Sequence, residues 1–328
     1  MDLRQLDYFV HVAELGSFSK AASLLSIAQS ALSTRVRKLE VELKQPLLHR
    51  NGRGVTPTDA GKRLLQHARG ILMQVNRTRE ELAEFRSTPS GHIVIGLPPT
   101  IARLLTVPVL KDFRGHFAEA SIGIMEGLSA SIVEWLTTGR IDIGLVYNPT
   151  PSPAIEIVPL HEEPMYLIGA RTAGRARRWA AVPLRQLPRY PLIVPSRPNA
   201  NRMRIETQLA YFGLKPTIVL EVDGVATVLD AVREGYGYTV LPLTTVRPYN
   251  AEDSFSIQPI VKPKLMIQLA LIVSAQRPTT TLTQQVLQRL PQTALAILNA
   301  AAPARKKRPA PLRVGRFTKA GTSVSVSV

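Results

Sequence analysis

Apolar residues recur three or four positions apart in three successive stretches at the start of the chain, which predicts three short helices. The first stretch ends at Gly16, and Ser17 follows as a hydroxyl residue suited to cap the second helix. A break at Ser26–Ala28 separates the second stretch from the third. The apolar positions are, in order, Leu3, Leu6, Phe9, Val10 and Ala13; Phe18, Ala21, Ala22 and Leu25; and Leu32, Val36, Leu39 and Leu43. We expect these faces to pack together as a small helical bundle.

The opposite face of the third predicted helix is entirely polar. It carries amide, hydroxyl and guanidinium groups, which can hydrogen-bond to the base edges and phosphates of DNA. These residues are Gln29, Ser30, Ser33, Thr34 and Arg37. A basic, glycine-containing loop with Arg50 and Arg53 follows. This order is typical of a winged helix-turn-helix, and it favours DNA binding over the alternative of an ordinary solvated face of a three-helix bundle.

A longer helical pattern follows the basic loop. It begins at Thr56–Asp59, with Thr56 as the capping hydroxyl, Pro57 at the first helical position and Asp59 as an acid at the third, which is a good helix start. Apolar residues then alternate at spacings of four and three, with Thr78 as a polar interruption. The seam consists of Leu64, Ala68, Ile71, Val75, Leu82 and Phe85. Because little neighbouring chain could cover this seam, we expect it to pair with the same helix of a second subunit. The alternative is an amphipathic helix that lies on its own domain.

Pro89–Gly91 breaks the long helix, and beyond it short apolar runs alternate with amphipathic stretches. The runs predicted to be strands are residues 93–97, 122–125, 141–146, 165–168, 192–194, 218–222, 238–241 and 266–272. The stretches predicted to be helices are residues 107–113, 132–136, 203–212 and 225–232. This alternation predicts an α/β domain with a mostly parallel sheet and helices on both faces.

Ligands of open α/β sheets bind beyond the carboxyl ends of the strands, often against helix N-termini. This rule selects loop residues that offer hydroxyl groups, backbone amides and a cation. They are Pro99, Thr100, Ser129, Tyr147, Ser196, Arg197 and Val225. Because Arg197 is the cation of this set and can pair with a carboxylate, the expected ligand is a small anionic metabolite. For each hydroxyl residue, a role as a simple helix N-cap is an equally good interpretation.

Composition narrows the class of protein further. The 328 residues are 45% hydrophobic, which is enough for two domains with substantial cores. No apolar run reaches membrane-spanning length and no signal peptide is apparent, so we expect a cytoplasmic protein without a membrane partner. The chain has no cysteine, six scattered histidines, and neither a phosphate loop nor a nucleophile elbow. We therefore expect no catalytic residues, no metal and no cofactor.

Five pieces of the N-terminal sequence resemble the DNA-binding signature of the LysR-type transcriptional regulators. They are residues 17–22 (SFSKAA), 29–33 (QSALS), 39–40 (LE), 46–50 (PLLHR) and 56–61 (TPTDAG), in the family's order and spacing. Residues 53–59 further resemble the branch of the nitrogen assimilation control regulators. The resemblance covers residues 1 to about 298. It implies a winged helix-turn-helix, a linker helix that pairs in a dimer, and an effector domain whose two α/β subdomains are similar to periplasmic binding proteins.

The resemblance also assigns roles to individual residues. It places Gln29, Ser30, Ser33 and Thr34 in the major groove, and Arg50 and Arg53 at the DNA backbone or minor groove. The family's effector contacts fall in the loops selected above. This sequence departs from the family at two positions. Ala28 replaces a capping threonine, so Ser26 or Ser30 would have to satisfy the helix amides. Thr34 replaces a longer, often cationic side chain.

These observations predict a LysR-type regulator that binds double-stranded promoter DNA as a homodimer or homotetramer and responds to a small-molecule effector. RNA polymerase is a further candidate partner. The alternatives are a ligand-binding receptor or an enzyme of the periplasmic-binding-protein fold, which the second domain alone would permit. The predicted parts are a DNA-binding domain (1–57), a linker helix (58–88), an effector domain (89–300) and a tail (301–328). Within the effector domain, subdomain I takes residues 91–160 and 268–300, and subdomain II takes residues 161–267.

The tail differs from the rest of the chain in its charge. The whole sequence has a net charge of +17, and residues 301–328 contribute seven Lys and Arg residues without any acid. We expect this segment to be disordered. It could add nonspecific attraction to phosphates, or it could be an appendage without a role.

Overall fold

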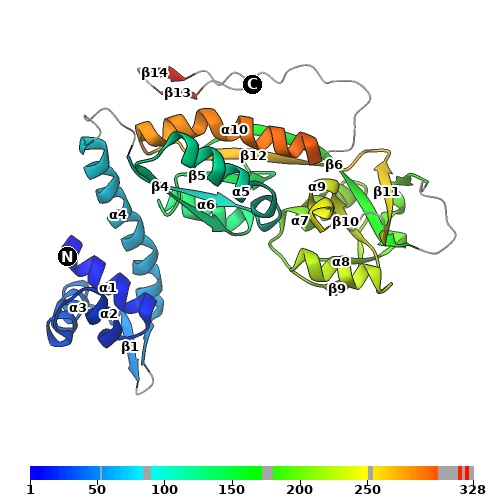
Figure 1. The fold of residues 1–328 in the computed structure, drawn as a ribbon. Coiled ribbons are helices and arrows are strands. Elements are labelled where there is room, and N and C mark those ends of the chain that lie inside the picture. Colours follow the sequence, from blue (N-terminus) through cyan, green and yellow to red (C-terminus); the bar gives the residue numbers. More distant parts are fainter. Residues whose placement is uncertain are drawn as a thin grey trace. The chain divides into compact units, whose positions relative to one another are not determined.

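The computed structural model describes residues 1–51, 54–83, 90–171, 180–249, 254–301, 317–319 and 322–324. Among these, the side chains of residues 77, 80–83, 301, 317–319 and 322–324 are not described. The chain divides into two compact units, Met1–Thr88 with Thr137–Arg140, and Pro89–Leu136 with Ile141–Val328. Figure 1 shows the elements of both units. No described helix is long and apolar enough to span a membrane.

The N-terminal unit begins with three helices and a two-stranded antiparallel hairpin, followed by a long helix. The elements are α1 (Leu3–Leu15), α2 (Phe18–Leu24), α3 (Gln29–Leu43), β1 (Leu48–Asn51), β2 (Gly54–Pro57) and α4 (Asp59–Ala83). Asp2 and Gln5 form a capping box at the start of α1, and Gly16 ends this helix with a φ of 61°. Ser17 caps α2 by accepting a hydrogen bond from the Lys20 amide. The predicted winged helix-turn-helix is confirmed.

A single apolar core holds these helices together. Phe9 of α1 and Leu32, Val36 and Leu39 of α3 are fully buried in it. Leu43, predicted to be buried, is half-buried at the end of α3. Because the buried positions of α3 lie on one side of the helix, its polar residues lie on the outward side.

The start of α3 differs from the expectation. Ala28 is the N-cap residue and makes no side-chain cap, and neither Ser26 nor Ser30 replaces it in the described structure. Ser26 instead forms the turn with a φ of 54°. The first amides of α3 are therefore left without a side-chain acceptor.

The apolar seam of α4 divides into two parts. Ala68 is fully buried in the core of the helical bundle, and Leu64 packs against the same core. Beyond them, Ile71 is 39% exposed and Val75 is half-buried. The predicted seam residue Leu82 lies in the helix, but its side chain is outside the described residues. The alternative of a helix packed on its own domain thus applies to the first turns of α4 and not to Ile71.

The second unit contains a mixed eight-stranded sheet, a separate pair of strands and covering helices. Its first part consists of β3 (Gly91–Leu97), α5 (Pro99–His116), β4 (Ala120–Glu126), α6 (Ser129–Thr137), β5 (Ile143–Tyr147) and β6 (Ile155–Ala170). Its second part consists of β7 (Val182–Pro183), η1 (Leu184–Arg189), β8 (Pro191–Val194), α7 (Ala200–Ala210), β9 (Thr217–Glu221), α8 (Val225–Arg233), β10 (Thr239–Pro242), α9 (Leu243–Val246), η2 (Arg247–Tyr249) and β11 (Phe255–Val261). The chain then returns through β12 (Met266–Ser274) and α10 (Thr281–Ala301). The predicted α/β class is confirmed.

The main sheet has the order β4-β3-β5-β12-β6-β11-β7, with β10 also paired to β6. Alternate residues of its strands face different helices, as the two-residue period of a strand requires. Ile93 and Ile95 belong to the core cluster with α5 and α10, while Val94 packs with Ile132 of α6 on the other face. In the second part, Leu192 packs toward α7 and Ile193 toward α8 in the same way. Both faces of the sheet are therefore covered.

Two long strands connect the subdomains. β6 pairs with β12 through Pro164 and with β10 from Met165 onward, so one strand continues from subdomain I into subdomain II (Figure 1). The sequence predicts the first crossing near Leu160–Glu162 and the return near Leu265–Gln268. The expectation of a mostly parallel sheet is wrong at its centre, because β12 runs antiparallel to both β5 and β6. A chain that crosses to a second lobe and returns in neighbouring strands must pair them in opposite directions.

The C-terminal tail is described only at two short strands, β13 (Phe317–Lys319) and β14 (Thr322–Val324), which pair with each other. The rest of residues 302–328 lies outside the described residues. The disorder of this segment stays a prediction.

Candidate nucleic-acid interface and effector site

The polar residues predicted to contact DNA all lie on the outward side of α3. Gln29, Ser30, Thr34 and Arg37 are exposed, and Ser33 is half-buried. The Gln29 side-chain oxygen accepts a hydrogen bond of 2.9 Å from the hydroxyl of Ser19 in α2. This bond uses the amide oxygen and leaves the side-chain N–H groups of Gln29 as its donors. The sequence analysis did not identify Ser19, although it lies at the start of the helix before the turn.

Thr34 is less available for hydrogen bonding than the sequence indicates. Its hydroxyl donates a 2.8 Å hydrogen bond to the carbonyl oxygen of Ser30, one helical turn earlier. The hydroxyl proton is therefore used within α3, so the Thr34 oxygen can only accept further hydrogen bonds. Apolar contact with a thymine methyl suits such a side chain better than a phosphate contact.

The wing, which is the hairpin of β1 and β2, contributes one described arginine, Arg50. The Arg50 side chain is 36% exposed, and its Nη1 donates a 3.2 Å hydrogen bond to the Ser33 hydroxyl. Its Nη2 lies 3.4 Å from a carboxylate oxygen of Glu40. The guanidinium carbon also lies 4.7 Å from the centre of the Phe18 ring. Arg53, the second predicted wing arginine, is outside the described residues.

The structure brings together the predicted ligand residues of subdomain I. Thr100 lies in the first turn of α5 after β3, Ser129 begins α6 after β4, and Tyr147 ends β5. The Ser129 hydroxyl accepts a 3.0 Å hydrogen bond from the Tyr147 amide. Pro99 is the first residue of α5, with no side-chain cap before it. All four residues lie at the carboxyl ends of the parallel strands, as the rule for α/β sheets requires.

Tyr147 is the most unusual residue of this group. Its side chain is buried, and its hydroxyl finds no hydrogen-bond partner of good geometry among the described residues. Burial raises the pKa of the phenol well above its usual range, the nearby Glu163 carboxylate raises it further, and the Thr100 hydroxyl lowers it slightly. A buried hydroxyl without a partner is costly, so this position favours a bound polar group.

Sequence reasoning missed Glu163, which lies in β6 next to the point where that strand changes partners. It is buried, and it accepts hydrogen bonds from the hydroxyl and the backbone amide of Thr244 at the start of α9. Burial raises the pKa of this carboxyl group to about 7, while the bonds from Thr244 and the charge of Arg247 oppose the rise. Little in the sequence pointed to it, because Glu163 precedes the predicted strand 165–168 and stands between Glu162 and Pro164.

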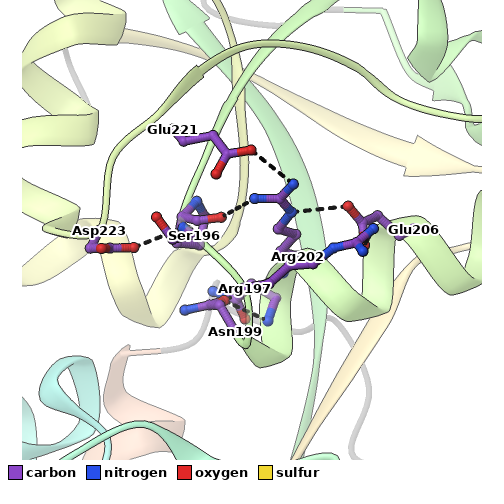
Figure 2. A network of polar contacts seen from close by, with 9 residues as sticks. Ser196, Arg197, Asn199, Arg202, Glu206, Glu221 and Asp223 are labelled. Carbon is purple, nitrogen blue, oxygen red and sulfur yellow. Dashed lines mark hydrogen bonds and ion pairs between the residues drawn. The ribbon is translucent and has the colours of Figure 1, made fainter.

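The predicted residues of subdomain II are engaged in a polar network (Figure 2). The Ser196 amide donates a 2.7 Å hydrogen bond to Asp223, and Arg197 forms a 2.8 Å ion pair with Glu206. Arg202, which is buried, contacts both Glu206 and Glu221 at 2.9 and 3.0 Å. These bonds hold the loop before α7. The Ser196 amide, predicted to be free for a ligand, is occupied.

Arg197 is therefore a paired cation. Its side chain is 63% exposed, while that of Glu206 is 15% exposed and is shared with Arg202. Val225, the last predicted residue, is half-buried at the start of α8, where Gly224 gives no side-chain cap. Within the described residues, no hydrogen bond or ion pair joins the subdomain II set to Thr100, Ser129 or Tyr147.

The sequence matches two family descriptions. Residues 3–62 match "Bacterial regulatory helix-turn-helix protein, lysR family", and residues 86–294 match "LysR substrate binding domain". The nitrogen assimilation regulatory protein nac of Klebsiella aerogenes is 33% identical over 287 residues, covering 87% of this chain and 93% of that protein. The transcriptional regulator CzcR of Bacillus anthracis is 28% identical over 246 residues, covering 75% of this chain and 82% of that protein.

Two solved structures share the fold. A full-length variant of OxyR from Pseudomonas aeruginosa superposes with a TM-score of 0.69 at 22% identity, covering 94% of this chain and 99% of that chain. Full-length CbnR in complex with its target DNA superposes with a TM-score of 0.64 at 21% identity, covering 92% of this chain and 100% of that chain.

A winged helix-turn-helix, a long helix and an α/β ligand-binding domain define a DNA-binding transcriptional regulator with an effector domain. The chain belongs to the LysR family of transcriptional regulators. Members of this family are regulators and not enzymes.

The buried Glu163 predicts a specific dependence of stability on pH. Its pKa is about 7 in the folded protein and 4.5 when unperturbed, so between these values the folded state retains a proton that the unfolded state has lost. Its contribution to the free energy of unfolding is complete below the lower value and is lost as the pH rises to about 7. The loss should approach about 3 kcal/mol.

We expect Glu163→Gln to flatten this part of the profile, because glutamine does not titrate. Urea unfolding from pH 4.5 to 8, followed by tryptophan fluorescence, reports on this unit, since neither of the two tryptophans of the sequence falls within the residue ranges of the N-terminal unit. Glu162→Gln, at the exposed neighbouring residue, is the matched control and should keep the parental profile. An unchanged profile in Glu163→Gln would show that this carboxyl group titrates normally.

Proposed function

We propose that the exposed face of α3 reads the sequence of promoter DNA. Gln29, Ser30, Ser33 and Thr34 contact base edges in the major groove, and Arg37 contacts a phosphate. Arg53 reaches the backbone or the minor groove beside the wing. The observation that carries this proposal is the division of α3 into one fully buried apolar side and one polar outward side.

Two local features support the assignment. The bond from Ser19 fixes the Gln29 amide group before DNA is bound, which reduces the side-chain entropy that binding removes. The first amides of α3, left without a side-chain cap at Ala28, can donate to a DNA phosphate at the helix N-terminus. Both features are at the end of the helix that enters the groove in helix-turn-helix proteins.

This proposal can be tested with an operator selected from a random DNA library by the full-length protein. Gln29→Ala should weaken operator binding by about 1–3 kcal/mol, because alanine cannot form a bidentate hydrogen bond to a base, while binding to a random duplex changes little. Gln292→Ala, at an exposed residue of α10, is the control for removal of the same side chain. Titrations at fixed salt that show equal weakening on both duplexes would exclude base reading by Gln29.

We further propose that the protein binds DNA as a homodimer through α4. Ile71 and Val75 follow the part of the seam that the protein's own bundle covers, and they leave apolar surface exposed. A partner helix would bury them, as in a coiled coil. Two α3 helices related by a two-fold axis would then read half-sites about 34 Å apart, or a multiple of that spacing. Assembly into tetramers and contact with RNA polymerase are proposals that rest on family membership alone.

Charges placed in the exposed part of the seam test the dimer. The double variant Ile71→Asp and Val75→Asp should be monomeric, because two carboxylates per helix would be buried without partners. Asn76→Asp adds a charge at an exposed neighbouring position and should stay dimeric. Light scattering measures the mass of each folded variant. A dimeric double variant would rule out pairing through this seam.

We propose that the effector is a small anionic metabolite that binds between the two α/β subdomains. Thr100, Ser129 and Tyr147 would contact it from subdomain I, with Pro99 beside them, and Ser196, Arg197 and Val225 from subdomain II. The Tyr147 hydroxyl supports a polar ligand group, because it is buried without a partner among the described residues. A ligand carboxylate can replace Glu206 at the exposed side of Arg197, since Glu206 keeps its bond to Arg202.

Such an effector would favour one relative arrangement of the subdomains. By linkage, it can change DNA affinity only as far as it binds the two arrangements differently.

A screen of metabolites by thermal unfolding tests the effector site. A ligand at one hundred times its Kd should stabilise the protein by about 2.7 kcal/mol, and this gain should shrink in Thr100→Val and in Arg197→Ala. Arg189→Ala removes an exposed arginine outside the site and should respond as fully as the parent. A stabilising metabolite to which both site variants respond fully would place the site elsewhere.

A further inference from the structure

Both carboxylate oxygens of Glu40 in α3 contact the wing or the turn that leads into it. One carboxylate oxygen accepts hydrogen bonds from the backbone amides of Leu47 and Leu48, at 2.9 and 3.1 Å. The other faces the Arg50 guanidinium at 3.4 Å. The side chain of Glu40 is only 16% exposed. Hydrogen bonds to a charged acceptor in such a site are stronger than those between neutral groups.

The Arg50 guanidinium is occupied on its edges and on one face. It bonds to Ser33 and Glu40 of α3, and its central carbon lies over the Phe18 ring of α2. An arginine on the surface of a DNA-binding domain is ordinarily expected to bind a DNA phosphate. Here its charge is matched by Glu40, and its contacts join the wing strand to both helices of the helix-turn-helix.

The segment between α3 and the wing is also fixed from its other side. Thr58, just before α4, donates from its hydroxyl to the Pro46 carbonyl at 2.7 Å and from its amide to the Leu47 carbonyl at 2.9 Å. Gly61 in the first turn of α4 approaches so closely that an added Cβ would collide with the Leu47 carbonyl oxygen. The wing is therefore attached to a segment that cannot shift without breaking bonds to α3 and α4.

We propose that Glu40 and Arg50 are positioning residues that hold the wing and the Ser33 hydroxyl in a fixed relation to the recognition helix α3. Arg50 is then not a phosphate contact, in contrast to the prediction from sequence. Glu40, which belongs to the signature but has no role predicted from sequence, sets DNA specificity without touching DNA. The part that concerns Ser33 rests on the proposed reading of base edges by α3.

Four variants of the full-length protein separate a positioning role from a phosphate contact. Arg50→Lys keeps the charge but loses the fork to Ser33 and Glu40 and the flat stacking surface. Arg50→Met also removes the charge. Glu40→Gln keeps an oxygen that can accept from the Leu47 and Leu48 amides, so the turn can still form. Glu42→Gln is the matched control, because Glu42 is an exposed acid of the same helix that pairs with the N-terminal ammonium group.

Two quantities are measured for each variant. One is the preference for the selected operator over a random duplex at fixed salt. The other is the slope of log Kobs against log salt on the random duplex, which falls by about 0.9 for each phosphate that the protein no longer neutralises. Circular dichroism confirms that each variant is folded.

Arg50→Lys, Arg50→Met and Glu40→Gln should each lower the operator preference about tenfold, with the parental salt slope. The double variant of Arg50→Met and Glu40→Gln should lose no more preference than either single variant, since the pair acts as a unit. Glu42→Gln should behave as the parent. The proposal is overturned if Arg50→Lys keeps the parental preference, or if Arg50→Met reduces the salt slope.

These outcomes differ from a failure of base reading by α3. If α3 does not read bases, Gln29→Ala also leaves the operator preference unchanged. If only the positioning role is wrong, Gln29→Ala still lowers the preference, and the Arg50 and Glu40 variants keep the parental value.

Discussion

The antiparallel pairing of β6 with β12 is the constraint on which the effector domain depends. These two strands carry the chain into subdomain II and back, and they share nine residue pairs from Ile155 to Pro164. Because β6 then continues as a partner of β10 and β11, the two subdomains share one strand. The carboxyl ends of β3, β4 and β5 and the acid Glu163 are thereby placed at the junction of the subdomains. The proposed ligand site lies at this junction.

In the winged helix-turn-helix, a small number of polar contacts determines the position of the wing. Its core is formed by local apolar periodicity, but the position of the wing depends on one polar side chain. Glu40 lies in α3 beside the buried residues Val36 and Leu39. Its carboxylate accepts hydrogen bonds from the backbone amides of the turn that leads into β1. Apolar packing determines that the three helices form a bundle, and a few directional bonds determine where the wing lies. DNA recognition needs the second as much as the first.

Much of this structure could be predicted from sequence because it depends on short-range patterns. The helices α1 to α4 and the cap at Ser17 follow from spacing and capping. The predicted start of α4 was two residues too early, because Pro57 ends β2 and Thr58, not Thr56, accepts the hydrogen bond from the Gly61 amide. The strand β11, residues 155–164 of β6 and the helix α10 were not predicted. The antiparallel centre of the sheet could not be predicted from short-range patterns, because it depends on long-range pairing. Residues such as Ile157 and Ile272 pair although more than one hundred positions of sequence separate them.

The positions of the proposed effector-site residues could be predicted only in part from the sequence. The strand-end rule located Thr100, Ser129 and Tyr147, because the carboxyl ends of parallel strands meet at one edge. It could not show that Glu206 pairs with Arg197, since that contact depends on how α7 packs. It also could not select Glu163, because an acid in a strand is ordinarily expected on the solvent side. Charge pairing and burial of single groups are tertiary properties, and they decide the chemistry of both sites.

We propose that α3 and the wing act as one rigid DNA-reading surface. This can be measured by hydrogen–deuterium exchange of the full-length protein, with and without a saturating amount of its selected operator duplex. We expect slower amide exchange on DNA binding at residues 29–37 and in the described wing strands, Leu48–Asn51 and Gly54–Pro57. Unchanged exchange in α3 and in both wing strands at saturation would contradict it.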